Sequence, residues 1–194
     1  SVLHDPEGLI NLMGGKDNYV KKMDEIFTSK PSSDYSYYGF KIHEILEMEL
    51  AGMGQYAHGN QPIQHAIYLY NYAQEPWKTQ EKVRYVMDNL YGSGADGYCG
   101  DEDNGQTSAW FVFSSLGFYP VAPVTGQYVI GSPLFKQATI KLSNGKELKI
   151  NANENSDKNI FINSFKFNQL ESNNNWIDHN ILKAVSYTHL TLPT

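Results

Sequence analysis

Three consecutive acids stand in a glycine-bracketed loop directly before a segment with the character of a buried aromatic helix. Residues 97–110 read GYCGDEDNGQTSAW. Asp101 and Asp103 are two residues apart, so extended backbone would point both side chains the same way. A carboxylate pair brought together can hold or deprotonate a water molecule, which is the work of a general base. The spacing therefore predicts proton-transfer chemistry at this loop.

Two other interpretations of the loop stay open. It can be a solvated turn in which Asp103 or Thr107 caps the helix that follows. The order Asp101-x-Asp103-Asn104-Gly105 also superficially matches a calcium loop, but the further oxygen ligands and the distal Glu of that pattern are missing. The apolar run after the loop favours a position at the mouth of a packed helical core, which supports the functional interpretation.

A second group of polar residues offers oxygen donors. Glu44 and Glu47 are three apart and share a helix face, and Asn60 and Gln61 stand at the start of another predicted helix. Hard oxygen donors select Ca²⁺ over transition metals, although a pair of Glu residues can equally be a solvated face. No two histidines show the zinc spacing with a nearby Glu, and Cys99 is the only cysteine, which argues against a zinc site.

The composition excludes some classes of protein. The 194 residues carry a net charge of -6 and a single arginine, so the clustered basic residues of a nucleic-acid-binding protein are absent. No apolar run approaches the roughly 20 residues that cross a bilayer, and no leader is visible. The sequence does not begin with Met, so a leader can precede it. Fourteen tyrosines suit a sugar-binding cleft, and they equally suit an ordinary core.

The positions of proline and glycine and the hydrophobic period predict the elements that hold these residues. Helices are expected from Asp5-Pro6 to Gly14, after an Asp17 cap, over 39–52, from Gln61-Pro62, from Pro76, and over 107–116. Alternating patterns then predict strands at 127–130, 138–142, 147–150 and 159–162, with a hairpin turn at 143–146. The fold class is α+β: helical hairpins over 1–120, followed by antiparallel strands over 121–184.

The last ten residues do not continue this pattern. Residues 185–194, VSYTHLTLPT, resemble the translation of a transposon-end sequencing adaptor. We therefore expect them to be a read-through product outside the fold. The alternative is a natural strand that ends at Pro193.

Several segments in order are similar to one known family. They are GNQP at 59–62, YLYNY at 68–72, PWKTQ at 76–80, GDEDNGQTSAW at 100–110, GFYP at 117–120 and YVIGSPLF at 128–135. Together they resemble glycoside hydrolase family 92, the calcium-dependent exo-acting α-mannosidases. The resemblance covers about residues 3–170. It implies the closing helical hairpins of an (α/α) six-hairpin barrel, with strands that return to a β-sandwich.

The resemblance also implies a reaction, the inverting hydrolysis of α-mannosidic bonds of N-glycans or mannan. Asp101 and Asp103 match the general-base positions, and Glu102 is expected to be structural. The general acid of the family is a Glu upstream of His4, outside this sequence, so the fragment is expected to be inactive alone. Export to the periplasm, cell surface or exterior is a family expectation.

For the remaining site, the resemblance implies a Ca²⁺ ion and substrate contacts. Glu47 and Asn60 are expected to bind the metal. Gln61 is expected near the metal and the substrate, although many members have Glu there. His43 and Glu44 match a pair that contacts the leaving sugar in members cutting α-1,2 bonds. A different reading is a non-catalytic carbohydrate-binding or scaffold protein that retains the family fold.

Overall fold

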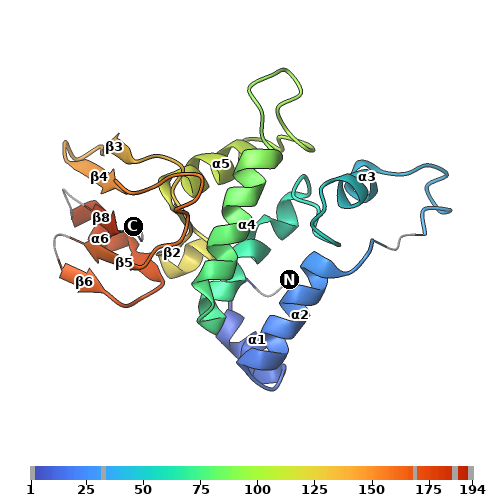
Figure 1. Cartoon of the computed structure of the whole chain (residues 1–194), viewed down its shortest axis with the longest axis horizontal. Coiled ribbons are helices and arrows are strands. Elements are labelled where there is room, and N and C mark those ends of the chain that lie inside the picture. The colour runs from blue at the N-terminus through green and yellow to red at the C-terminus, as the bar shows by residue number, and fades with distance from the viewer. Residues whose placement is uncertain (1–2, 32–33, 168–169, 185–187, 192–194) are drawn as a thin grey trace.

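The computed structural model describes residues 3–31, 34–167, 170–184 and 188–191. Within these residues, helices come first and short strands follow (Figure 1). The helices are α1 Pro6–Leu12, α2 Lys16–Thr28, α3 His43–Leu50, the 3-10 helices η1 Gln61–Ala73 and η2 Pro123–Thr125, α4 Pro76–Asn89, α5 Gln106–Leu116 and α6 His179–Ala184. The strands are β1 Phe118–Tyr119, β2 Gln127–Ile130, β3 Gln137–Lys141, β4 Glu147–Asn151, β5 Ser164–Phe167, β6 Leu170–Ser172, β7 Trp176–Asp178 and β8 Thr188–Thr191.

Most helix boundaries follow from local signals in the sequence. The Asp5 carboxylate accepts a hydrogen bond from the Gly8 amide at 2.8 Å and so caps α1. Proline stands in the first turn of α1, η1 and α4, where its missing N–H costs nothing. Two details were wrong. Gly15, and not Asp17, is the N-cap of α2, and α3 is shorter than the predicted 39–52 because Gly39 and Gly52 adopt positive φ angles.

The strands form two sheets. One has the order β1-β2-β7 and is antiparallel. The other has the order β3-β4-β8-β5-β6, in which the β4–β8 pair is parallel and the other pairs are antiparallel. The predicted hairpin turn joins β3 to β4, with Gly145 at a φ of 80°. The prediction of antiparallel strands is therefore correct except at β4–β8.

The strand predicted at 159–162 does not form. Its backbone groups bond to side chains instead of to a neighbouring strand: the Ser132 hydroxyl donates to the Ile160 carbonyl at 2.6 Å, and the Ile162 amide donates to the Gln80 side chain at 3.0 Å. Because Gln80 lies on α4, this segment fastens the β region to the helices. The alternating sequence pattern carried no sign of these distant partners.

The segment that we expected outside the fold is only partly within the described residues. Thr188–Thr191 form β8, which lies between β4 and β5, so the structure differs from our expectation there. Backbone hydrogen bonding along a strand edge is open to any segment of β-forming sequence. Residues 185–187 and 192–194 lie outside the described residues. The origin of 185–194 as adaptor read-through stays a prediction, and the gene sequence tests it.

Two hydrophobic cores hold the molecule together. The larger packs α1, α2, η1, α4 and α5 around Trp110, which is fully buried. The smaller lies beneath the sheets, around Ile130, Leu148 and Phe165. Phe113 on α5 contacts both cores. In Figure 1 the strands gather on one side and α1 to α3 on the other, with α4 between them. Helix α5 thus connects the two cores directly behind the acidic loop.

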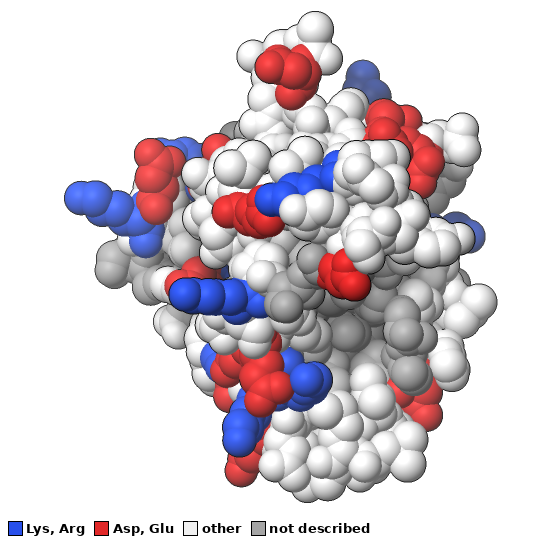
Figure 2. Space-filling view, turned by 90° about the vertical axis from the view of Figure 1, so that its right-hand side faces the viewer, with Lys and Arg blue, Asp and Glu red and all other residues white. Residues whose placement is uncertain are grey.

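The molecular surface carries charges of both signs. On the face shown in Figure 2, the basic and acidic side chains are interspersed among uncharged ones. Among the described residues, no helix combines the length and the apolar character that a membrane span requires.

Candidate active site

The predicted site residues come from three segments: α3, the segment 57–61 that leads into η1, and the acidic loop before α5. The backbones of Gly59 and Gly100 are in direct contact. A Cβ placed on Gly59 would lie 2.8 Å from the Gly100 Cα, and a Cβ on Gly100 would lie 2.6 Å from the Gly59 Cα. Real Cβ atoms do not approach backbone this closely, so both positions require glycine. This close approach brings the segment 57–61 into contact with the acidic loop.

Glu47 from α3 completes the junction. Both of its carboxylate oxygens accept hydrogen bonds from the Gly59 amide, at 3.0 and 2.9 Å, and its side chain also lies against the Cys99 thiol. The residue is buried, at 7% exposure. Burial raises the pKa of the Glu47 carboxyl above its usual range, against the opposing effect of these hydrogen bonds. Glu47 therefore faces the two loops and not the solvent.

The thiol beside Glu47 is not a ready nucleophile. Burial, followed by the charge of Glu47, raises the pKa of Cys99 to about 12. A thiol must lose its proton to act as a nucleophile or a metal ligand. Cys99 therefore serves here as a packed, neutral neighbour that donates to the Glu47 carboxylate.

Gln61 and Thr107 fix the main chain of the acidic loop. The Gln61 side-chain amide donates to the Asp101 carbonyl at 2.6 Å, and the Thr107 hydroxyl donates to the same carbonyl at 2.8 Å. The Thr107 hydroxyl also accepts from Gln61 and from Gln64, both at 3.3 Å. Thr107 has no exposed surface. The position of Asp101 is thus set by side chains from η1 and α5.

Glu102 is structural, as expected. Its carboxylate accepts from the Gly105 amide at 2.6 Å and from the Ser108 amide at 3.3 Å, so it caps the N-terminus of α5. The Ser108 hydroxyl and then the Gly105 amide hold the pKa of the Glu102 carboxyl below its usual range. The N-cap residue of α5 is Gly105, and the side-chain acceptor at this helix start is the Glu102 carboxylate, in place of the Asp103 or Thr107 cap considered from the sequence. The negative charge of one of the three crowded acids is therefore stabilised by hydrogen bonds to the start of α5.

Asp101 and Asp103 remain exposed on the turn. Among the described residues, neither carboxylate has a hydrogen-bond or ion-pair partner within the protein. The backbone here is not extended: Asp103 and Asn104 have φ angles of 53° and 57°, in the left-handed region, and Gly105 follows at 97°. The extended-strand argument for the Asp101–Asp103 pair was wrong at this point, because the Glu102 cap draws the chain into a tight turn. Asp and Asn tolerate such angles better than most residues.

The other predicted residues lie near the junction. Asn60 and Gln61 are half-buried and follow Gly59 directly. His43 is exposed at the start of α3, with its Nε2 3.5 Å from the half-buried Glu44 carboxylate. His43 and Glu44 thus stand one turn before Glu47, on the solvent side.

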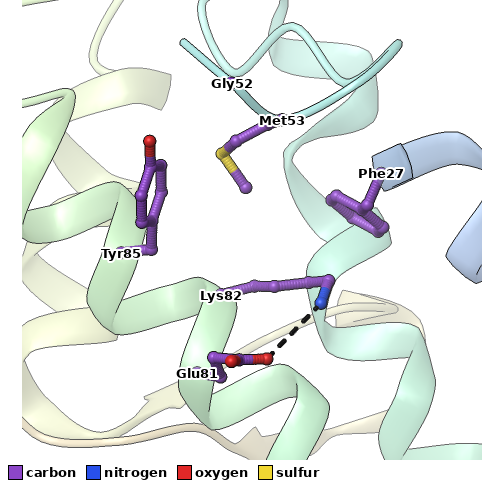
Figure 3. A pocket seen from close by; sticks show the side chains of 6 residues that line it. All are labelled: Phe27, Gly52, Met53, Glu81, Lys82 and Tyr85. Carbon is purple, nitrogen blue, oxygen red and sulfur yellow. Dashed lines mark ion pairs between the residues drawn. The ribbon is translucent and has the colours of Figure 1, made fainter. Parts of the chain in front are cut away.

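A separate cavity lies elsewhere on the helical region. It has a volume of about 230 Å³ and is lined by Phe27 of α2, Gly52 and Met53 after α3, and Glu81, Lys82 and Tyr85 of α4. Figure 3 shows Lys82 extended toward Phe27, with its ammonium 3.8 Å from Glu81. None of the predicted site residues lines this cavity, so we do not assign it the chemistry of the acidic loop.

Reasoning from the sequence missed the residues that hold the site in place. Thr107 was considered only as a helix cap, and Gln64 and Cys99 were given no role. Gln64 is fully buried and donates to the His58 carbonyl at 3.1 Å as well as to Thr107. The available signal was a polar residue among the mostly apolar side chains of η1, where a buried polar group must find a hydrogen-bond partner.

Comparison with known proteins places this arrangement in a family. Residues 1–192 match the glycosyl hydrolase family 92 catalytic domain, and the chain belongs to that family. The inverting mannosidase BT2199 of Bacteroides thetaiotaomicron is similar in structure, with a TM-score of 0.82 and 52% identity over 98% of this chain and 26% of that one. The α-mannosidase BT3965 of the same organism, in complex with mannoimidazole, has a TM-score of 0.80 and 33% identity over 92% of this chain and 22% of that one.

A curated relative extends the similarity to a fungus. An uncharacterized secreted glycosidase of Arthroderma benhamiae is 28% identical over 98% of this chain. The match covers 22% of that protein. The chain therefore spans about a quarter of the length of its relatives, and it contains mixed helices and strands that match a part of their catalytic domain.

Proposed function

We propose that this chain is part of an inverting exo-α-mannosidase in which Asp101 and Asp103 form the general-base site. The observation that carries the proposal is the contrast within the acidic loop. Glu102 is bound by backbone amides, whereas the Asp101 and Asp103 carboxylates project from the same turn, exposed and without a protein partner in the described residues. Family membership supports the reaction class, and two relatives are a mannosidase with inversion and an α-mannosidase.

The chemistry of inversion assigns the acids a defined task. A water oxygen attacks the anomeric carbon while the bond from that carbon to the leaving oxygen breaks. Asp103, with Asp101 beside it, holds the water and accepts its proton. A general acid on the opposite side of the sugar, about 6.5–9.5 Å from the base, protonates the leaving oxygen. We assign that acid to a segment upstream of His4, so this chain alone is proposed to be inactive.

The donors near the acidic loop fit part of a calcium site. Glu47 supplies a buried carboxylate whose hydrogen-bond partners in the described residues are the Gly59 amide, the Cys99 thiol and the His58 backbone. Asn60 and Gln61 add amide oxygens next to it. Calcium takes 6–8 oxygen ligands, so these three residues would cover only part of its shell. The described residues contain no group of three His, Cys, Asp or Glu that could hold a metal by themselves.

The proposed metal therefore needs water, sugar hydroxyls or other segments as further ligands. A bound Ca²⁺ would supply positive charge that orients mannose hydroxyls. Glu47 and Asn60 would hold it, while Gln61 would serve the substrate side because its amide nitrogen is committed to the Asp101 carbonyl.

The finer features of the function rest on the family resemblance. We propose that His43 and Glu44 contact the leaving sugar, which favours α-1,2 bonds of N-glycans or mannan. We also propose that the helices close an (α/α) six-hairpin barrel and that the strands return to a β-sandwich. A location in the periplasm, at the cell surface or outside the cell agrees with the secreted fungal relative.

The principal test uses the full-length parent protein. Asp103→Asn should lower kcat by about 10²–10⁴, the range expected for general acid–base catalysis, with little change in KM or thermal stability. Asp157→Asn, which changes an exposed acid in the β region, is the matched control and should leave kcat unchanged. Near-normal turnover of Asp103→Asn would remove the base assignment. Absence of a Glu at the upstream acid position would instead support a non-catalytic carbohydrate-binding or scaffold protein.

Metal removal gives a second test of the same site. A chelator should abolish hydrolysis by the full-length enzyme, and Ca²⁺ should restore it better than Zn²⁺ because the available donors are oxygens. Glu47→Ala should raise the Ca²⁺ concentration needed for half-maximal activity without unfolding the protein, as checked by circular dichroism. Full activity in the chelator would contradict a calcium requirement.

A further inference from the structure

A buried histidine next to the candidate site takes no part in the proposed chemistry. His58 has no exposed surface, and both of its ring nitrogens are bonded. Its Nδ1 lies 2.7 Å from the Tyr56 hydroxyl, and its Nε2 lies 2.8 Å from the Tyr91 hydroxyl. Tyr91 in turn donates to the Thr107 carbonyl at 3.1 Å. The four residues form one continuous chain of hydrogen bonds, which we call the His58 relay.

The direction of each hydrogen bond in the relay is determined. Tyr91 has one hydroxyl proton, and a carbonyl can only accept, so this proton goes to Thr107. Tyr91 must therefore accept from the Nε2–H of His58. The buried ring faces two neutral hydroxyls in these bonds, so in its neutral form it carries one proton, on Nε2, and its Nδ1 accepts from Tyr56. The relay fixes one tautomer of the histidine.

Aromatic packing fixes the geometry of the relay as well. The His58 ring meets Trp110 edge-on, with centroids 4.3 Å apart. The Tyr91 ring lies parallel to Trp110, at a centroid distance of 5.9 Å and an interplanar angle of 4°. Trp110 itself donates to the Gln64 carbonyl at 3.2 Å. Neither relay ring can rotate without disturbing this buried cluster, so the hydroxyl of Tyr91 is held at a fixed point beneath Thr107.

The relay ends on the residue that holds the acidic loop. The Thr107 carbonyl accepts a hydrogen bond from the Tyr91 hydroxyl, and the Thr107 hydroxyl donates one to the Asp101 carbonyl. Its amide donates to the Glu102 carbonyl at 3.1 Å. At the other end, His58 directly precedes Gly59, whose amide binds Glu47. The relay therefore connects the backbone on which Glu47 rests to the backbone that presents Asp101 and Asp103.

We infer that His58 is a positioning residue, which acts through Tyr91 and Thr107 to set the acidic loop against the Glu47 junction. The consequence for hydrolysis rests on the proposed function, whereas the consequence for the order of the loop does not. The relay ends at a carbonyl, so it has no group that could pass a proton to the acids. Its loss should lower kcat by displacing the carboxylates and leave the shape of the pH–rate profile unchanged.

The experiment compares matched substitutions in the full-length protein. Tyr91→Phe removes the hydroxyl and keeps the ring against Trp110. Tyr70→Phe is the control: Tyr70 is fully buried, whereas Tyr91 is half-buried, and the Tyr70 hydroxyl donates to Asp24 of α2 at 2.9 Å, away from the loop. His58→Asn and His58→Gln form a second pair: the shorter amide can pair with Tyr56 only, while the longer one can present an N–H toward Tyr91.

Two measurements are made on each variant: the hydrogen-exchange rate of the amides over 101–108, and kcat and KM with an α-mannoside. Tyr91→Phe should speed exchange in this segment and lower kcat about ten- to hundred-fold, since small misplacements of reacting groups cost up to about that much. Tyr70→Phe should leave both unchanged. His58→Gln should recover part of the kcat that His58→Asn loses, at equal thermal stability.

The outcomes separate this inference from the proposed function. Unchanged exchange over 101–108 in Tyr91→Phe, or equal changes in Tyr91→Phe and Tyr70→Phe, would overturn the positioning role. A fully active Asp103→Asn would overturn the base assignment alone, and the exchange data would still decide the role of the relay. If His58→Asn and His58→Gln both misfold, Tyr91→Phe remains the deciding variant.

Discussion

The helical region and the β region are held together by different kinds of interaction. In the helical region, the site depends on buried polar side chains that bond to distant backbone, as Gln61 does to Asp101 and Glu47 does to Gly59. In the β region, backbone ladders and apolar contacts dominate, as in the five paired residues of β3 and β4. In the helical region the position of the site therefore depends on a few individual hydrogen bonds. In the β region stability is distributed over many equivalent backbone hydrogen bonds.

This difference predicts unequal sensitivity to substitution. A buried polar group that loses its partner costs about 1–3 kcal/mol, while an exposed polar change away from such a feature usually costs less than about 0.5 kcal/mol. The helical region should therefore respond to single-atom changes that the sheets tolerate.

Arg84 is where the two regions meet. The residue is 4% exposed, and its Nη1 donates to the Pro133 carbonyl at 2.9 Å and to the Asn155 side chain at 2.8 Å. Arg84→Met keeps most of the shape and leaves both acceptors unpaired. We expect a loss of about 3 kcal/mol in the free energy of unfolding, measured by urea denaturation of the full-length protein.

Lys166→Met provides the comparison for Arg84. Lys166 pairs with Glu171 at 3.3 Å on the surface of the sheet. Exposed ion pairs contribute about 0–1 kcal/mol, so this change should scarcely move the denaturation midpoint. Equal losses for the two variants would contradict the view that α4 fastens the β region through its buried arginine.

His58 should make the stability of the helical region depend on pH. Its pKa in the folded protein is about 3, below the ordinary value of 6.5, so the unfolded chain binds more protons between these values. The contribution of neutral His58 to the free energy of unfolding is then fully present above pH 6.5, and it is lost as the pH falls toward 3. Between pH 7 and 4.5, this single group should remove about 2 kcal/mol.

The measurement is the difference in unfolding free energy between the parent and His58→Gln at both pH values. That difference should shrink by the same amount at pH 4.5, because the variant has no group to titrate. His179→Gln, at a histidine bonded to Tyr128 beside the sheet at 3.0 Å, is the comparison substitution in the β region. A constant difference across the two pH values would mean that His58 does not remain neutral in the folded state.

Thr107 allows the same atomic change to be tested in both regions. Thr107→Val removes the hydroxyl that donates to Asp101 and accepts from Gln61 and Gln64. We expect a loss of about 1–2 kcal/mol in the unfolding free energy, and a lower kcat in the full-length protein. Thr139→Val, on an exposed position of β3, should change the unfolding free energy by no more than about 0.5 kcal/mol and should leave kcat unchanged. A neutral Thr107→Val would show that the hydroxyl does not hold the loop.

The sequence predicted the parts of this structure that depend on neighbouring residues. Proline and glycine located α1, α4 and α5, and the asparagine–glycine turn located the β3–β4 hairpin. The prediction of a strand at 159–162 was wrong because the hydrogen-bond partners of this segment lie on α4 and in the loop at Ser132. A pattern within one segment carries no information about such long-range bonds.

The same limit applies to the candidate site. The acidic loop, Glu47, Asn60 and Gln61 were identifiable from residue types and family resemblance. The turn at Asp103 was not, because it depends on which acid caps α5. His58 was also missed, since Tyr91 lies 33 residues away and nothing near His58 in the sequence distinguishes it from a structural histidine.

The hairpin turn of the β region should show the smallest response. Gly145 has a φ of 80°, and a Cβ added there would meet no atom within 4 Å. Gly145→Ala therefore adds only the strain of a left-handed backbone, about 1 kcal/mol, with no clash and no lost hydrogen bond. The turn keeps its Gly145 amide bond to Leu142 at 3.0 Å, and the β3–β4 ladder keeps its register. Urea denaturation should register this small loss, while kcat of the full-length protein stays unchanged because the turn is remote from the acidic loop. A measurable loss of kcat in Gly145→Ala would mean that strain in the sheet reaches the site, and the separation of the two regions would then be wrong.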